Sequence, residues 1–504
     1  MNETTINETA VPFENGRQGA VEKRIVIDVS PYRTRVVLLE NGHAAEVYSE
    51  QHNRESLVGN IFRGRVRSIL PGMAAAFVDI GEEKNAFFSM SDLRPQVAAE
   101  AGIENAKPPK LKVGQELMVQ IIKDPYGTKG ARVSSQISIS GHLLVLFPTE
   151  DTIGISKNIT DEAERERLKA IVSAAKDDGV GVIVRTAAEG RYEADLIAEL
   201  RELSAKWKNI STAYRGAIAP KRIYREYGLV ERTVRDLFRP DVASITVNDR
   251  ECFDTLRTVV DEVEPGSAER VHLEDNEPNL FEVLGIEKQI DEALSRRVWL
   301  KSGAYIVIDR TEALISIDVN SGKNIGKTDL QQTALATNCE AAEEIARQLR
   351  LRDIGGIIII DFIDLENKND RQTVVRTLRE AMRFDRTTTV VHGMTALGLV
   401  EVTRKKLREN LPSSLQADCP CCEGSGKVLS YESVALKIRA RILSRILKEG
   451  PKRVSITADP NVIRLIRKHL SEECRRYSLK ESDFVLNERL SVKTDEFELH
   501  YLND

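Results

Sequence analysis

The chain has 504 residues, which is enough for about three or four domains of the usual size, roughly 100 to 200 residues each. Its 73 Lys and Arg residues are outnumbered by 78 Asp and Glu residues, so the net charge of -5 excludes a uniformly basic nucleic-acid-binding protein. Any binding of nucleic acid must therefore depend on local basic surfaces.

The first part of the chain is predicted to be mainly β-sheet. Residues 1–21 are polar and are expected to be a disordered leader. Runs rich in β-branched residues at 24–29 and 34–39 predict two strands. Between residues 59 and 140, short predicted strands alternate with Gly and Pro, which is typical of a small barrel, and residues 100–109 are expected to form a loop within it.

The middle of the chain mixes both kinds of element. Residues 141–225 are expected to contain a helix at 161–175, a strand at 181–185 and a second helix at 194–210. Alternating elements follow to residue 274, and a helix is predicted at 282–299.

An α/β domain of about 120 residues follows. Apolar runs at 304–308 and 313–318 predict strands, and Thr328 with Gln331 forms a capping-box pattern that opens a helix ending near Leu351. The run 357–360 predicts a buried strand, so the strands on either side of the helix should be parallel. A helix at 371–383 and a strand at 387–392 continue the alternation.

Two aspartates end the central strands of this domain. Asp318 and Asp361 should both lie at the carboxyl edge of a parallel sheet, which is where such sheets bind ligands. A pair of carboxylates suits Mg²⁺, which takes one or two of them and keeps several waters. Asn320 can point the same way and offers an amide. The alternative is that both aspartates only cap loops.

Residues 64–81, GRVRSILPGMAAAFVDIG, resemble an S1-type RNA-binding domain, a form of the OB-fold barrel. Arg63, Arg65 and Arg67 alternate along one strand and could follow successive phosphates, although such a row is often only a solvated face. Phe77 and Phe87 could stack on bases. Phe88 is expected to fill the barrel core instead.

A Cys-x-x-Cys pair, Cys419 and Cys422, lies in a Gly-rich turn. A closed zinc site needs four ligands, so the simplest complete site takes this pair from each of two chains. A redox pair is the alternative, but such pairs normally follow a strand and open a helix, whereas Pro and Gly flank this one. Cys421 is a third thiol without an assigned role.

These motifs, in this order, resemble the ribonuclease E/G family from about residue 25 to the C-terminus. The most specific stretches are TEALISIDVNSG (311–322), RLRDIGGIIIIDFID (350–364) and the Cys-Pro-x-Cys turn. The resemblance implies a magnesium-dependent endoribonuclease in which Asp318 and Asp361 hold the metal and Asn320 positions an aspartate and the scissile phosphate. It implies cleavage of single-stranded, often AU-rich RNA that leaves 5′-phosphate and 3′-hydroxyl ends.

The resemblance also implies further contacts with RNA and between chains. A 5′-monophosphate would be bound by Arg185 and Thr186 and would stimulate cleavage. The barrel residues that match RNA contacts are Phe77, Phe87, Lys123 and Lys129. Cys419 and Cys422 match a zinc link that joins a homodimer, and two dimers are expected to pair into a homotetramer. The implied roles are rRNA maturation and mRNA turnover.

The family's architecture implies a multi-domain α/β and α+β fold. An RNase H-like subdomain is expected from residues 22–54 and 226–298, with an S1-type OB-fold domain (55–140) and a 5′-sensor domain (141–225) inserted. A catalytic DNase I-like α/β domain (299–415), a zinc link (416–428) and a small C-terminal α/β domain (429–504) follow.

Two features refine this expectation. An arginine is expected at the position of Ala396, which would affect RNA contacts near the active site. The sequence ends about 80 residues after the zinc turn, so we expect the short ribonuclease G type without the degradosome-scaffold tail of the E type.

The chain has no run of about 18 apolar residues and no signal-peptide pattern, so we expect a cytoplasmic protein without a membrane span. A non-catalytic RNA-binding assembly factor is the main rival function. A small-molecule phosphatase is weaker, because it leaves the barrel unexplained.

Overall fold

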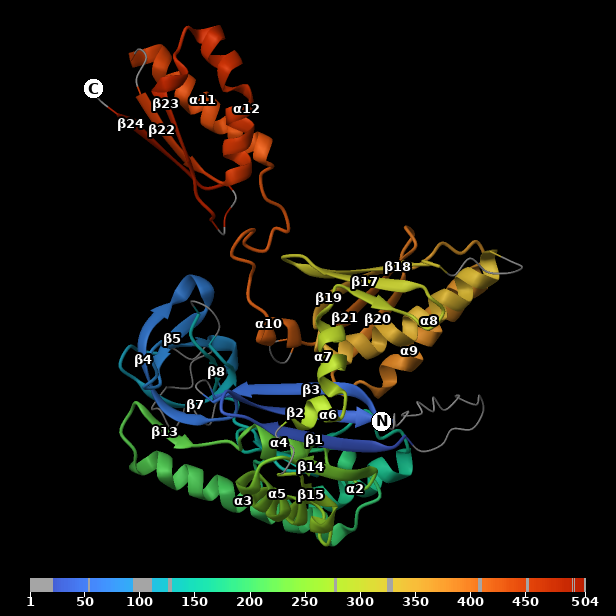
Figure 1. The fold of residues 1–504 in the computed structure, drawn as a ribbon. Helices are drawn as coiled ribbons and strands as arrows, with labels where there is room; N and C mark the ends of the chain where they lie inside the picture. Colours follow the sequence, from blue (N-terminus) through green and yellow to red (C-terminus); the bar gives the residue numbers. More distant parts are fainter. Residues whose placement is uncertain are drawn as a thin grey trace, which may run out of the picture. The chain divides into compact units, whose positions relative to one another are not determined.

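The computed structural model describes residues 21–52, 55–93, 111–125, 129–275, 279–323, 330–406, 410–449, 453–491, 493 and 495–502. The chain divides into two compact units, residues 1–414 and 415–504 (Figure 1). In the described part, the larger unit contains four β-sheets and the smaller unit contains one.

The first sheet joins segments that are far apart in the sequence. Its strands, in the order β15-β14-β1-β2-β3, are β1 (Lys23–Val29), β2 (Arg33–Glu40), β3 (His43–Gln51), β14 (Val242–Val247) and β15 (Val271–Leu273). Strands β1 and β2 confirm the sequence prediction, whereas β3 was not predicted. Because β1 pairs in parallel with β14, residues 52–241 are inserted into this sheet between its strands. Four helices accompany it, namely α4 (Leu229–Leu237), α5 (Arg250–Val263), α6 (Leu280–Val283) and α7 (Ile286–Leu294).

The inserted segment begins with a closed five-stranded barrel. Its strands are β4 (Ile61–Leu70), β5 (Ala75–Asp79), β6 (Ala86–Ser89), β7 (Glu116–Lys123) and β8 (Arg132–Ser134), and it closes because β4 pairs with both β5 and β7. Phe88 is fully buried, as predicted. The predicted loop at 100–109 lies outside the described residues. The barrel is OB-like, and β13 (Lys221–Tyr224) extends it beside β4.

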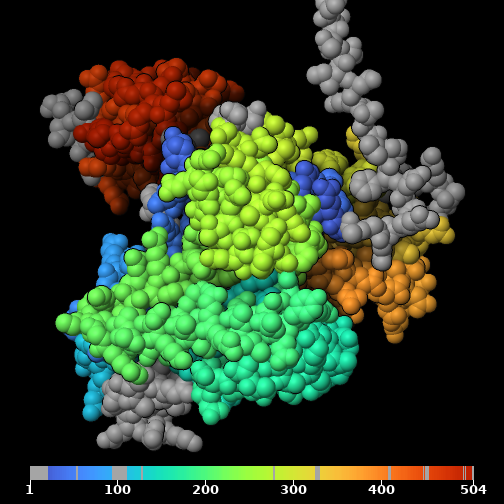
Figure 2. Space-filling view, turned by 90° about the horizontal axis from the view of Figure 1, so that it is seen from below, coloured from blue at the N-terminus to red at the C-terminus, as the bar shows by residue number. Residues whose placement is uncertain are grey.

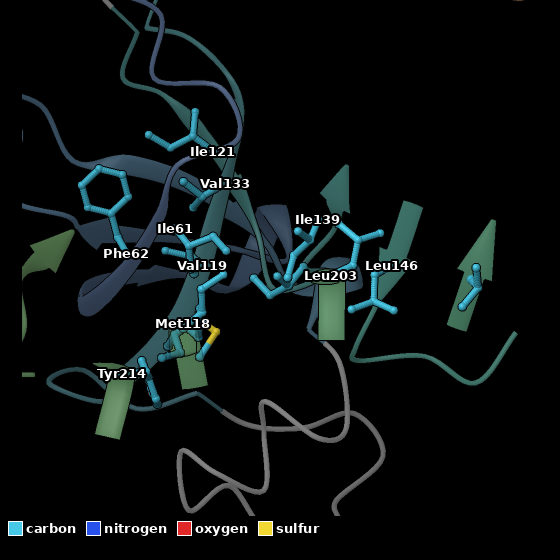
Figure 3. Packing of buried hydrophobic residues seen from close by; sticks show 14 of the residues in the cluster. Ile61, Phe62, Met118, Val119, Ile121, Val133, Ile139, Leu146, Leu203 and Tyr214 are labelled. Carbon is cyan, nitrogen blue, oxygen red and sulfur yellow. The ribbon is translucent and has the colours of Figure 1, made fainter. Parts of the chain in front are cut away.

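An α+β unit completes the insertion. It contains β9 (Ile139–Ser140), β10 (Leu144–Phe147), β11 (Ile153–Ile155), β12 (Gly181–Val184), α2 (Glu162–Ala175) and α3 (Glu193–Gly216). Its core is continuous with that of the barrel, since Ile61 and Met118 of the barrel belong to the same buried cluster as Leu146 and Leu203 (Figure 3). Helices α2, α3 and α5 lie at the bottom of Figure 1 and form the near face in Figure 2, in teal and green. An Arg191–Glu264 ion pair links the start of α3 to the end of α5.

The second large sheet carries the predicted α/β pattern. Its strands, in the order β16-β17-β18-β19-β21-β20, are β16 (Arg297–Trp299), β17 (Tyr305–Arg310), β18 (Leu314–Asn320), β19 (Gly356–Asp361), β20 (Thr389–Met394) and β21 (Leu399–Arg404). Helices α8 (Leu330–Leu351) and α9 (Lys368–Ala381) pack against one face, and α10 (Leu411–Leu415) follows the sheet (Figure 1). Strands β18 and β19 are parallel, as predicted. Thr328 lies outside the described residues.

Two predictions for this region are wrong. The helix expected at 282–299 is interrupted at Gly285, whose left-handed backbone (φ 65°) separates α6 from α7, and residues 297–299 form β16 instead. The run 357–360 is not buried on both sides, since Ile357 is 52% exposed while Ile358 and Ile360 are buried. The reason is that α8 and α9 lie on one face of the sheet, so alternate residues of β19 point away from them.

The smaller unit is an α/β layer pair. Its strands β22 (Arg453–Ala458), β23 (Phe484–Glu488) and β24 (Phe497–Leu502) form one sheet, and its helices are α11 (Tyr431–Glu449) and α12 (Pro460–Tyr477). Val434, Ile438 and Val462 of the helices pack on Val454 and Ile456 of the sheet. In neither unit does a described helix combine the length and the apolar character needed to span a membrane.

Candidate active site

The parallel pairing of β18 with β19 brings the two predicted carboxylates together. Asp318 and Asp361 are register partners at the carboxyl ends of their strands, and both are exposed. The amide Nδ2 of Asn320 donates to Oδ2 of Asp318 at 2.7 Å. The structure therefore places all three predicted residues at one edge of the sheet, with Asn320 orienting one of the carboxylates.

A buried asparagine holds the segment that follows Asp361. Asn338 of α8 is 0% exposed, and its Nδ2 donates to the Ile363 carbonyl oxygen at 2.8 Å. Its Oδ1 accepts from the Ile363 backbone N–H at 3.0 Å. Both polar atoms of one side chain thus bind the two backbone polar groups of Ile363, which anchors the loop after β19 to the crossover helix. The sequence analysis did not single out Asn338, although an Asn on an otherwise apolar helix face was a usable signal.

A third carboxylate contributes to the electrostatics of the pair. Partial burial, together with the negative charges of Asp318 and Asp364, raises the pKa of Asp361 above its ordinary value. Repulsion of this kind is relieved by a cation, and two carboxylates with an amide fit Mg²⁺, which binds few protein ligands and retains waters. No set of three His, Cys, Asp or Glu side chains arranged for metal binding occurs among the described residues. Asp364 was not selected from the sequence, although it follows Asp361 by three residues.

The hairpin that joins β20 to β21 borders this edge, because Leu399 is the register partner of Asp361. Ala396 is exposed in the turn of that hairpin, which is closed by a hydrogen bond from the Thr395 N–H to the Leu399 carbonyl oxygen at 2.8 Å. The position at which an arginine was expected therefore adjoins the carboxylates, and here it carries no charge.

On the barrel, the predicted aromatic residues form one end of a polar and aromatic row. Phe77 and Phe87 are register partners whose rings meet edge to face, with centroids 6.3 Å apart. Phe87 is paired with Arg132, and Arg132 is paired with Lys123. The row crosses four strands and adds Arg132 to the predicted set. Lys129 is exposed just before β8.

The arginine row on β4 does not offer free cations, contrary to the sequence hypothesis. Arg63 and Arg65 each bind Glu116 of β7 at 2.8 Å, and Arg67 binds Asp79 of β5 at 2.6 Å. Arg63 also donates to the Tyr214 carbonyl oxygen at 2.8 Å. Neighbouring strands supply carboxylates on the same face, so these arginines hold the barrel together and join it to α3.

Arg185 and Thr186 lie at the end of β12, each with a side-chain partner. Arg185 Nη1 binds Asp236 Oδ1 at 2.6 Å, and the Thr186 hydroxyl lies 2.8 Å from that of Ser156. The charges of Arg185 and Arg235 lower the pKa of Asp236, despite a burial effect in the opposite direction.

A cavity of about 200 Å³ lies nearby, and both charge signs line it. Its cations are Lys23, Arg239, Arg350, Arg383 and Arg386, and its carboxylates are Glu40, Glu46, Asp241 and Asp385. Burial and the charges of Arg386 and Arg185 lower the pKa of Arg239. In the part of the chain that the structure describes, the Arg239 side chain forms no ion pair. Neighbouring cations thus destabilise the charged form of Arg239, so an anion beside this side chain would be favoured.

The cysteine pair lies in a tight turn of the smaller unit. The Glu423 N–H donates to the Cys419 carbonyl oxygen at 2.8 Å, and the Ser425 N–H donates to that of Cys422 at 2.9 Å. Hydrogen bonds from the backbone N–H groups of Cys422 and Cys421 lower the pKa of the exposed Cys419 thiol. This favours the thiolate, which is the form that binds metals.

Comparisons with known proteins agree with these motifs. The model of the ribonuclease E/G family matches residues 138–407. Ribonuclease G of Escherichia coli (strain K12) is 38% identical over 477 residues, which cover 94% of this chain and 96% of that protein. Ribonuclease G of Haemophilus influenzae is 36% identical over 94% of this chain and 97% of its own length. Ribonuclease E of the same organism is 34% identical over 96% of this chain but only 52% of its own length. The chain therefore belongs to the ribonuclease E/G family, and its similarity is to the ribonuclease G type.

Proposed function

We propose that this protein is a magnesium-dependent endoribonuclease that hydrolyses phosphodiester bonds in single-stranded RNA. The observation that carries the proposal is the register pairing of Asp318 with Asp361 beside Asn320, in a chain of this family. Cleavage leaves 5′-phosphate and 3′-hydroxyl ends, and AU-rich segments are preferred. Its cellular roles are rRNA maturation and mRNA turnover, in the cytoplasm.

Each residue of the candidate site has its own role in the proposed cleavage. Asp318 and Asp361 would hold Mg²⁺, and Asn320 keeps the Asp318 carboxylate oriented through its 2.7 Å hydrogen bond. The metal, when bound, would supply activation of the attacking water and neutralisation of charge on the phosphate. Asn338 fixes the loop after β19 and so maintains the direction of Asp361. The second amide proton of Asn320 is suited to contact the scissile phosphate.

The barrel binds the RNA strand. Phe77 and Phe87 provide partly exposed rings for stacking on bases, and Lys123, Lys129 and Arg132 provide cations for phosphates. This division of roles between rings and cations is typical of sequence-tolerant binding of single strands, in which aromatic rings contact bases and cations contact the backbone.

A 5′-monophosphate binds at Arg185 and Thr186 and stimulates cleavage. A guanidinium and a hydroxyl match the oxygens of a phosphate, and the nearby Arg239 adds positive charge. The Asp236 carboxylate holds Arg185 in place through their 2.6 Å ion pair.

Cys419 and Cys422 of two chains would together hold one Zn²⁺, since one pair supplies only two of four ligands. The resulting homodimers pair into a homotetramer.

The proposal is tested with purified protein and an internally labelled, 5′-monophosphorylated single-stranded RNA. Internal cuts that appear with Mg²⁺, disappear without it and leave ends that a ligase can join are expected. Tight binding without any cut under these conditions would contradict the proposal and favour the assembly factor instead.

A further inference from the structure

An aromatic and cationic cluster lies beside the carboxylate pair. Trp299 of β16 is the register partner of Tyr305 of β17, and Tyr305 is in turn the partner of Asn320. In the adjacent row, Arg297 is paired with Val307, which is paired with Asp318. Paired residues of antiparallel strands point to the same face, so all these side chains lie on the sheet face opposite α8 and α9, here called the outer face.

The cluster is in close contact. The rings of Trp299 and Tyr305 meet edge to face, with centroids 5.2 Å apart and planes at 60°. The Arg297 guanidinium carbon lies 4.5 Å from the Tyr305 ring centroid and 5.7 Å from that of Trp299. The Tyr305 and Asn320 Cα atoms are about 5 Å apart because they are register partners.

This cluster does not serve the core of the domain. Trp299 is 56% exposed, whereas its neighbour Val298, which points the other way, packs against the buried cluster beneath the sheet. Arg297 is exposed and has no carboxylate partner in the described part of the chain. A large exposed aromatic with an unpaired arginine is unusual for a purely structural role, since burying the rings would stabilise the fold more.

We propose that Trp299, Tyr305 and Arg297 form a base-stacking subsite that holds a nucleobase of single-stranded RNA next to the scissile phosphate. The inference rests on the proposed function, because it takes the carboxylate pair as the point of cleavage. Trp299 and Tyr305 offer ring surface to the base, and Arg297 either stacks on it or contacts an adjoining phosphate. The stacked base holds the RNA on the outer face of the sheet. Tyr305 lies on β17, the β-strand next to the one that carries Asn320.

The first test uses the small number of tryptophans. The chain has two, Trp207 in α3 and Trp299, so the full-length Trp207→Phe variant reports on Trp299 alone. Its fluorescence should be quenched by a dye-labelled single-stranded oligoribonucleotide without added divalent metal, whereas an abasic oligomer of equal length should leave it unchanged. Dye anisotropy shows that the oligomer is bound. Binding without quenching, or equal quenching by both oligomers, would overturn the subsite.

The second test compares variants in binding and in cleavage. Trp299→Ala should weaken RNA binding about tenfold, the usual effect of removing one stacking ring, and should raise KM more than it lowers kcat. Trp299→Phe should retain most of the binding. Tyr32→Ala removes an aromatic that is 83% exposed in the turn between β1 and β2 and serves as the control, with no expected change.

The outcomes separate the two proposals. If the wild type cuts RNA and Trp299→Ala binds and cuts as well as Tyr32→Ala, the subsite is wrong while the nuclease stands. Suppose instead that the protein never cuts RNA, but that the base-containing oligomer quenches the Trp299 fluorescence and the abasic oligomer does not. The stacking contact then stands while the proposed function fails.

Discussion

Asn338 illustrates how much of the site depends on a single buried side chain. We expect Asn338→Ala to lower the urea midpoint, since two hydrogen bonds are lost and the Ile363 peptide groups lose their partners, at a cost of about 1 to 3 kcal/mol. Cleavage by the folded protein should also fall, because Asp361 lies two residues before the released peptide.

The matched control is Asn248→Ala. Asn248 fixes Val29 in the first sheet in a similar way, accepting from its N–H at 2.8 Å. The Asn248→Ala substitution should lower the urea midpoint without reducing the activity of the folded protein. Equal losses of activity in both variants would show that Asn338 acts only on stability.

Arg185 gives a second prediction at the residue scale. Arg185→Ala should slow cleavage of 5′-monophosphorylated RNA by about tenfold or more, the usual value of a charge-assisted contact, while cleavage of 5′-hydroxyl RNA changes little. The measurement is a comparison of kcat/KM on the two substrates. An equal loss on both would remove the assignment of a 5′-phosphate site.

Residue identities could be predicted where a motif names them. Asp318, Asn320 and Asp361 follow from strand ends and from the family pattern, and the structure brings them together. Asn338 and Arg132 could not be predicted in this way, because each depends on which backbone or strand lies opposite it.

At the scale of elements, strands with strong β-branched runs and the long helix α8 were predicted, whereas β3 and β21 were missed. Their sequences, HAAEVYSEQ and LVEVTR, carry charged residues within the strand, which weakens the pattern. The side that α8 and α9 leave uncovered could not be predicted either. Four consecutive isoleucines suggest burial on both faces, and only the placement of the helices shows otherwise.

A buried carboxylate holds the contact between the first sheet and α8. Glu46 of β3 binds Arg386 at 2.8 Å and Arg350 of α8 at 3.3 Å. Burial alone would raise its pKa, but the two arginines hold that pKa well below its ordinary value. A carboxyl with a lowered pKa stabilises the fold above about pH 4.5, its value in the unfolded chain, and this stabilisation is lost as the pH falls further.

We therefore expect the wild type to lose stability between about pH 4.5 and 3 more steeply than Glu46→Gln. At pH 7, Glu46→Gln should be the less stable of the two by about 3 kcal/mol, because Arg386 loses its carboxylate partner and Arg350 keeps only Glu40. Urea midpoints across this pH range provide the measurement. Glu55→Gln removes an ion pair with Arg225 in which both side chains are about 60% exposed, and it should have little effect. Parallel pH curves for wild type and Glu46→Gln would contradict the account.

At the scale of the whole molecule, the order of the domains along the chain does not reveal how they are nested. Parallel pairing of β1 with β14 encloses the barrel and the following α+β unit within one sheet, and composition alone contains no signal for such a long-range pair. The family resemblance supplied that expectation. The shared core of the barrel and the α+β unit, in contrast, became visible only in three dimensions.

Assembly is the other property at this scale. We expect Cys419→Ser to release zinc and to lower the sedimentation coefficient of the protein, since two thiolates per chain make up the inter-chain site. Cys421→Ser, which changes the neighbouring thiol of the same turn, is the control and should keep both. A wild-type protein with one zinc for every two chains is expected. A Cys419→Ser variant that sediments like the zinc-containing wild type would refute the link.

The central claim is that the Asp318–Asp361 pair cuts RNA. It is tested most directly by measuring cleavage of a single-stranded, 5′-monophosphorylated RNA in Mg²⁺ by wild type, Asp318→Asn and Asp361→Asn. Asp309→Asn is the control, because Asp309 lies on the same face of the same sheet but is paired with Arg296. The account predicts that cleavage by Asp309→Asn stays near the wild-type rate and falls at least a hundredfold in the other two, while all four proteins bind the RNA. Cleavage that persists in Asp318→Asn or Asp361→Asn would contradict it.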